Sequence, residues 1–193
     1  MVFLNKGIRL DHYIKLTPLL VVFFAVIVIV GWIIGNTFLM NIKANYVPMM
    51  FETALLFLIT AIAFVRNYSN FLLGITFSTV VYTIIAAYFT SDSFLCFLPF
   101  FFNEQSSSYT YHQGIPSIAT LFNFLLISLT GLFKKFRKLI GKTIMIVSSI
   151  AFVGYLFNIP FLYFYVEDLS TGMAVHTSIL FLHLGLVLIH KNK

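Results

Sequence analysis

Charged residues are scarce in this sequence. Lysine, arginine, aspartate and glutamate make up 9% of its 193 residues, whereas hydrophobic residues make up 60%. About a quarter of the residues in a soluble domain carry charge, so this composition excludes an ordinary soluble globular protein. A mean hydropathy of +0.98 points the same way. We therefore expect the chain to lie in a lipid bilayer.

Cysteine and the common catalytic motifs are nearly or wholly missing. Cys96 has no second cysteine with which to form an internal disulfide, so it carries no information on the redox compartment. The sequence has no Gly-rich phosphate loop, no G-x-S-x-G motif, no H-E-x-x-H motif and no C-x-x-C pair. We expect no catalytic residues, no metal site and no cofactor.

Six apolar stretches are long enough to be membrane spans, since a helix needs about 20 mostly apolar residues to cross the hydrocarbon core. They cover residues 16–34, 47–65, 71–89, 115–133, 143–161 and 173–189. We predict an all-α membrane protein with a transmembrane domain at 16–190, a cytoplasmic segment at 1–15 and a cytoplasmic tail at 191–193. The first stretch is too long for a signal-peptide core and no small-residue cleavage site follows it, so we interpret it as an uncleaved signal anchor.

Basic residues are distributed asymmetrically around these stretches. Eleven of the twelve fall on one side of the predicted membrane, and only Lys43 falls on the other. The eleven are Lys6, Arg9, Lys15, Arg66, Lys134, Lys135, Arg137, Lys138, Lys142, Lys191 and Lys193. Since loops rich in Lys and Arg stay in the cytoplasm, both termini are predicted to be cytoplasmic. The net charge of +6 then reports topology and not a nucleic-acid partner.

A short pattern recurs in three of the apolar stretches. Each copy has a Thr followed four and five residues later by Phe-Leu, and these residues are Thr53, Thr120 and Thr177. In the first and third copies a Met, Met49 or Met173, precedes the Thr by four residues. Self-similarity of this kind indicates a repeated supersecondary unit. We predict three consecutive helical hairpins arranged around a pseudo-threefold axis.

The repeated Thr residues are candidates for a ligand pocket. Residues four apart share one face of a helix, so each Thr is expected to lie in line with the Phe that follows it. Three such faces would converge on the axis and line an outward-facing pocket. The alternative is packing, because Thr is common where membrane helices touch. Thr60 and Asn123 are predicted to form interhelical hydrogen bonds.

Aromatic residues end the first helix of each hairpin. Trp32, Tyr88 and Tyr155 each stand a few residues before a helix breaker. We interpret them as interfacial anchors, because such rings favour the headgroup level, and Trp32 and Tyr155 are also candidates for signal relay. The longest outer loop, 90–114, is expected to contain a segment that lies in the outer interface.

Two polar residues inside predicted spans are further candidates. Glu52 is the only acid in a span, and a carboxylate there is a functional candidate by default. The competing explanation is a favourable charge at the start of a helix. His176, His183 and His190 are spaced by seven, so neighbours lie about 10.5 Å apart, too far to share one metal ion. His176 is included among the candidate pocket residues.

Two pairs of segments combine a Gly-Trp or Gly-Tyr helix end with a following Met-x-x-x-Thr start. They are 31–35 with 49–58, and 154–163 with 172–177. This arrangement resembles the MASE-like, membrane-integrated N-terminal sensor domains of bacterial histidine kinases and diguanylate cyclases. The resemblance covers about residues 16–190, although the middle copy has Pro116 in place of Met. It implies a bacterial inner-membrane location, signal reception in the membrane, relay through the last helix, a cytoplasmic kinase or cyclase as output, and a homodimer.

We therefore expect a sensory membrane domain that is not itself an enzyme. No phospho-accepting helix, ATP-binding region or cyclase motif occurs up to Lys193, so the output module is expected on a partner chain or beyond that residue. One alternative is a small transporter or channel subunit, with Glu52 and the Thr residues along a path. Against it, the predicted spans carry almost no charge and none is interrupted at its centre. Another alternative is a structural subunit of a larger membrane complex.

Overall fold

The computed structural model describes residues 2–43, 46–89, 116–164 and 172–190, with side chains described except at 2–11, 87–89 and 164. Within these ranges 81% of the residues are α-helical and none lies in a strand, so the predicted all-α class is confirmed. The predicted interfacial segment in 90–114, the side chain of Tyr88 and the tail at 191–193 lie outside what the structure describes.

Each predicted apolar stretch overlaps one of the six main helices. The helices are α1 (Val2–Ile34), α3 (Phe51–Val65), α4 (Asn70–Phe89), α5 (Ile118–Leu129), α6 (Arg137–Leu156) and α8 (Val175–His190), with short turns α2 (Thr37–Met40), η2 (Lys134–Phe136) and α7 (Phe161–Phe164). The boundaries differ most at α1 and α6, which begin before residues 16 and 143. Hydropathy locates the apolar part of a helix, whereas Lys, Arg and Leu in the basic flanks are also good helix formers and continue it.

Within the described ranges, two helical segments are long and apolar enough to cross a bilayer. They are His12–Ile34, within α1, and Lys134–Leu156, which joins η2 to α6, and each has 23 residues. The described parts of α3, α4, α5 and α8 are apolar but shorter. Two such helices are weak evidence for a membrane protein, because a buried core helix or a signal sequence has the same length and composition.

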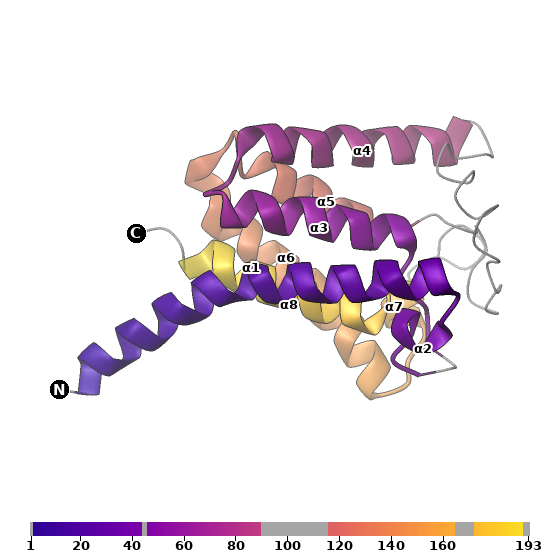
Figure 1. Ribbon diagram of the computed structural model, residues 1–193, viewed down its shortest axis with the longest axis horizontal. Helices are drawn as coiled ribbons and strands as arrows, with labels where there is room; N and C mark the ends of the chain where they lie inside the picture. The colour runs from indigo at the N-terminus through magenta and orange to yellow at the C-terminus, as the bar shows by residue number, and fades with distance from the viewer. Residues whose placement is uncertain (1, 44–45, 90–115, 165–171, 191–193) are drawn as a thin grey trace.

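The helices pack as three antiparallel pairs. In each pair a peripheral helix packs against an inner one: α1 against α3, α4 against α5, and α6 against α8. Neighbouring pairs meet through α3–α4, α5–α6 and α1–α8 contacts. Helices α3, α5 and α8 all begin at the end of the bundle where α2 and α7 lie, whereas the N-terminal part of α1 projects from the opposite end (Figure 1). We call these the α2–α7 end and the basic end.

Two tight turns are joined at the basic end. The turn from α3 to α4 places Asn67 and Tyr68 at positive φ, 56° and 61°. The guanidinium of Arg137 lies 4.0 Å from the centre of the Tyr68 ring, and its Nε donates a 3.0 Å hydrogen bond to the carbonyl of Thr130. Burial raises the pKa of Tyr68 to about 12, against the opposing effect of the Arg137 charge. The α5–α6 turn is thereby fixed to the α3–α4 turn.

Candidate functional site

The three repeated Thr residues occupy the same position in their helices. Thr53, Thr120 and Thr177 are the third residues of α3, α5 and α8, and all are at least 97% buried. A backbone hydrogen bond of 2.9–3.1 Å closes the first turn of each helix. The N–H of the residue after the Thr donates it to the carbonyl of the residue three positions before the Thr. Only α5 has a side-chain cap, in which Ser117 Oγ accepts from the Thr120 N–H at 3.1 Å. All three therefore lie at the α2–α7 end, inside the bundle.

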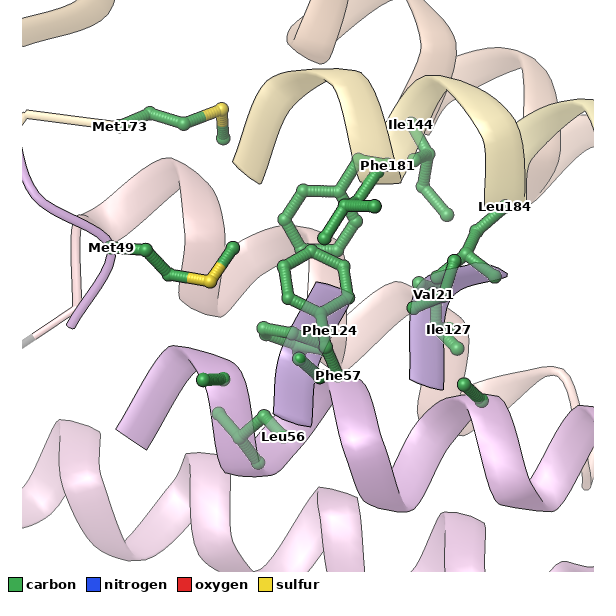
Figure 2. Packing of buried hydrophobic residues seen from close by; sticks show 14 of the residues in the cluster. Val21, Met49, Leu56, Phe57, Phe124, Ile127, Ile144, Met173, Phe181 and Leu184 are labelled. Carbon is green, nitrogen blue, oxygen red and sulfur yellow. The ribbon is translucent and has the colours of Figure 1, made fainter. Parts of the chain in front are cut away.

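One turn further along, the three inner helices meet through a triangle of phenylalanine rings. Phe57, Phe124 and Phe181 are fully buried, and their ring centroids are 4.7–4.8 Å apart in all three pairs. Figure 2 shows the three rings together, with Met49 and Met173 to one side of them. The expectation that the repeated faces converge is confirmed at these Phe residues. The rings fill the centre of the bundle, one helical turn from the Thr positions in the direction of the basic end.

Trp32 and Tyr155 have a different role from the one predicted. Each is 7% exposed, so neither is an anchor facing lipid headgroups, and this interpretation was wrong. Trp32 Nε1 donates to the carbonyl of Met49 at 2.8 Å, and the Tyr155 hydroxyl donates to the carbonyl of Met173 at 2.9 Å. A ring donor with a backbone acceptor in reach is more stable buried than exposed, because both polar groups are satisfied. Each hydrogen bond holds the end of a peripheral helix to the start of its inner partner.

The backbone around these two hydrogen bonds has the same pattern in α1–α3 and α6–α8. Gly35, just after α1, and Asn158, just after α6, have positive φ angles of 67° and 55°. The N–H that follows each of them bonds to the carbonyl of Gly31 or Gly154, at 2.8 and 2.7 Å respectively. Glycine is required at 31 and 154, because a Cβ there would lie 2.6 Å from the Cβ of Leu39 in α2 and 2.7 Å from the Cβ of Leu162 in α7, respectively. The N–H of Met49 donates to the carbonyl of Met40 in α2 at 3.1 Å, and the N–H of Met173 donates to the carbonyl of Tyr163 in α7 at 2.8 Å.

Glu52 is buried between two hairpins. It is 3% exposed, and its Oε1 accepts a hydrogen bond from the hydroxyl of Thr83 on α4. Its Oε2 has no hydrogen-bond partner among the described residues. A buried carboxyl with one free oxygen is costly in an apolar interior, and such groups mark functional positions more often than surface acids do. Glu52 therefore remains the most chemically unusual residue of the bundle.

His176 holds the position in α8 that Glu52 holds in α3, directly before the repeated Thr. Both of its ring nitrogens are buried without a hydrogen-bond partner in the described part of the chain. His183, by contrast, has Nδ1 2.8 Å from the carbonyl of Ile179, and its ring centroid is 6.2 Å from that of Tyr13. Of these two histidines, His183 is therefore a hydrogen-bonded packing residue, whereas His176 has two unpartnered ring nitrogens near the Thr positions.

Other buried polar groups join neighbouring hairpins. The hydroxyls of Thr60 and Thr76 are 3.4 Å apart between α3 and α4, and the Asn123 amide donates to the Ser148 hydroxyl at 3.3 Å between α5 and α6. The predicted interhelical hydrogen bonds of Thr60 and Asn123 are therefore confirmed. Among the described side chains, no three of His, Cys, Asp and Glu are grouped so that they could hold a metal ion.

No protein-family model matches this chain, no curated protein matches it, and no solved structure matches it. The functional argument therefore depends on the geometry alone. Sequence reasoning missed the hydrogen bonds of Trp32 and Tyr155, although one signal was present. Each of these residues follows a Gly and precedes a Met by 17 or 18 residues, a shared spacing that indicates a common local structure.

Proposed function

We propose that this chain is a membrane-embedded signal-sensing domain of six transmembrane helices, arranged as three hairpin repeats with both termini in the cytoplasm. A signal from the outer side or from the bilayer biases the packing of the hairpins, and α8 passes the change to a cytoplasmic output module. The output is a kinase or cyclase, on a partner chain or beyond Lys193, as the resemblance to MASE-like sensor domains implies. Its location would be a bacterial inner membrane.

The distribution of apolar and polar side chains supports the membrane placement. Large hydrophobic side chains are exposed along the outward faces of α1, α4 and α6, whereas Thr, Ser, Asn and Glu are buried between helices. Examples of the exposed residues are Leu19, Phe23, Val30 and Ile33 on α1, Phe71, Ile75 and Ile85 on α4, and Leu139, Ile146 and Val153 on α6. In water such a surface would aggregate, but in lipid it is the expected one. Only 39% of the apolar window in each of the two long segments is buried, unlike the core helix of a soluble protein.

The observation that carries the sensing proposal is the triangle of Phe57, Phe124 and Phe181. Because each ring comes from a different hairpin and touches the other two, no hairpin can shift without changing the contacts of both others. Above the triangle lie the buried Thr positions and the free polar atoms of Glu52 and His176. A ligand that binds there in one packing better than in another would shift the equilibrium between them.

Alanine at Thr53, Thr120 and Thr177 tests this proposal. The full chain is fused through α8 to a cyclase reporter, and output and membrane abundance are measured for wild type and variant. We expect the variant to change reporter output at least about threefold at unchanged abundance, since a small change in packing free energy below 1 kcal/mol suffices. Ser78→Ala, on the peripheral helix α4, is the control. A fall in abundance without a change in output per molecule would mean that the Thr residues only pack.

Glu52 favours a second candidate function, a small transporter or channel subunit. Its free Oε2, in the interior of the bundle, is a group that could bind a proton or a cation on a path. The three Phe rings argue against a path along the central axis, so such a path would have to run between α3 and α4, where Thr83 lies. Ion or proton flux into proteoliposomes that Glu52→Gln abolishes would favour this function over sensing. Co-purification with one fixed partner and loss of the chain without it would instead indicate a structural subunit.

A further inference from the structure

A cavity lies between α4 and α5 at the basic end, away from the Thr positions. Its volume is about 140 Å³, and its walls are almost wholly apolar, with Leu73, Gly74, Phe77 and Leu132 among the lining residues. Phe77 and Leu132 are 40% and 74% exposed, so the cavity opens onto the outside of the bundle. If the chain spans the membrane as proposed, this opening faces lipid.

Two glycines shape the cavity. A Cβ on Gly131 would lie 3.0 Å from Asn70 Oδ1 and 3.0 Å from a methyl group of Leu73, so this glycine lets the end of α5 approach the start of α4. A Cβ on Gly74 would meet nothing within 4 Å. The space beside Gly74 is therefore open, and a larger side chain there would enter the cavity instead of the helix contact.

The opening lies beside a cluster of positive charge. Gly131 and Leu132 line the cavity, and the exposed Lys134 and Lys135 follow after Phe133. Arg137 is engaged with Tyr68 and Thr130, whereas Lys134 and Lys135 are exposed and stand within three residues of the lining residue Leu132. An apolar cavity with cations at its mouth is complementary to a molecule that has an apolar tail and an anionic head.

We propose that this cavity binds an anionic phospholipid of the cytoplasmic leaflet, with part of one acyl chain beside Gly74 and the phosphate-containing headgroup on Lys134 and Lys135. Basic sites between transmembrane helices on the cytoplasmic side are a recurrent means of recognising anionic headgroups. The cytoplasmic leaflet carries negative lipid, and the cavity lies at the end predicted to face it. The inference depends on the membrane placement of the proposed function, but not on sensing.

The test is lipid retention by the full chain, purified from nanodiscs that contain equal amounts of phosphatidylglycerol and phosphatidylcholine. Native mass spectrometry counts the lipids that remain bound. We expect wild type to retain phosphatidylglycerol about tenfold over phosphatidylcholine, since two lysines near an anionic headgroup each contribute. Gly74→Leu, which fills the cavity, should abolish retention. Lys134→Gln with Lys135→Gln should abolish the selectivity. Lys15→Gln with Lys142→Gln, which removes two exposed cations farther along the chain from the lining residues, should preserve it.

A second measurement keeps the proposal testable if Gly74→Leu does not fold. Phosphatidylglycerol with a photoreactive acyl chain should crosslink wild type at peptides that contain Gly74 or Leu132. Equal retention of both lipids by wild type, or crosslinks confined to other helices, would overturn the proposal. Neither result would change the interpretation of the reporter test of sensing. Failure of the chain to incorporate into nanodiscs at all would overturn the membrane placement, and with it both proposals.

Discussion

At the scale of single residues, the most informative side chains are Trp32 and Tyr155. Aromatic residues near the ends of apolar stretches are ordinarily interpreted as lipid-facing anchors, and here that interpretation fails. The reason is that the sequence shows an amphipathic ring but not the carbonyl within its reach. The acceptors, Met49 and Met173, are 17 and 18 residues away and are brought close only when the chain reverses. A tertiary hydrogen bond of this kind overrides the preference of the ring for the interface.

Trp32→Phe and Tyr155→Phe test whether these two hydrogen bonds are equivalent. Each change leaves a buried carbonyl without its donor, which we expect to cost about 1 kcal/mol of unfolding free energy. Tyr155→Phe keeps the ring packing, whereas Trp32→Phe also removes one buried ring of the indole and should cost more by the packing that is lost. Reversible unfolding in mixed detergent micelles measures it. Tyr13→Phe, in which the hydroxyl is lost from a half-buried ring beside His183, is the control and should cost less than half as much. No loss for Tyr155→Phe would mean that its hydrogen bond to Met173 does not stabilise the α6–α8 connection.

At the scale of helices, α6 and α8 approach each other closely at a pair of glycines. A Cβ on Gly141 would lie 2.8 Å from the carbonyl oxygen of Gly185, and a Cβ on Gly185 would lie 2.9 Å from that of Gly141. The two glycines face each other, so the backbones approach directly, as small residues allow in membrane bundles. The sequence does not reveal this pair, because the glycines are on different helices and neither helix has a G-x-x-x-G spacing of its own.

Three alanine substitutions separate close helix contacts from open ones. Gly141→Ala and Gly185→Ala would each force α6 and α8 apart against a rigid backbone, which we expect to cost about 1–3 kcal/mol. Gly74→Ala, where the added Cβ meets nothing within 4 Å, should be neutral or stabilise by up to about 1 kcal/mol through helix propensity. Detergent unfolding of the three variants side by side gives the order. Equal effects at all three positions would show that helix propensity, and not contact, determines them.

At the scale of the whole molecule, hydropathy and the recurring Thr-Phe-Leu pattern were sufficient to locate α1, α3, α4, α5, α6 and α8 approximately, and to predict that Phe57, Phe124 and Phe181 converge. These features could be predicted because apolar runs and fixed spacing are properties of the sequence. The burial of Glu52 against Thr83 could not be predicted, since a charge near a helix start is equally compatible with an exposed position. The cavity beside Gly74 was also hidden, because it depends on how two helices from one hairpin diverge.

The number of membrane crossings is the property of the whole molecule on which all the proposals depend, and it can be measured with single cysteines. In a Cys96→Ser background, Ile42→Cys, Arg66→Cys and Lys135→Cys place one exposed thiol in each of three connections. If all six helices cross, Ile42→Cys reacts with a membrane-impermeant maleimide in intact cells, whereas the other two react only after permeabilisation. This follows because one crossing separates Ile42 from Arg66 and three separate it from Lys135. If only the two long helical segments cross, all three thiols lie on the same side and label alike, and the three-hairpin topology is wrong.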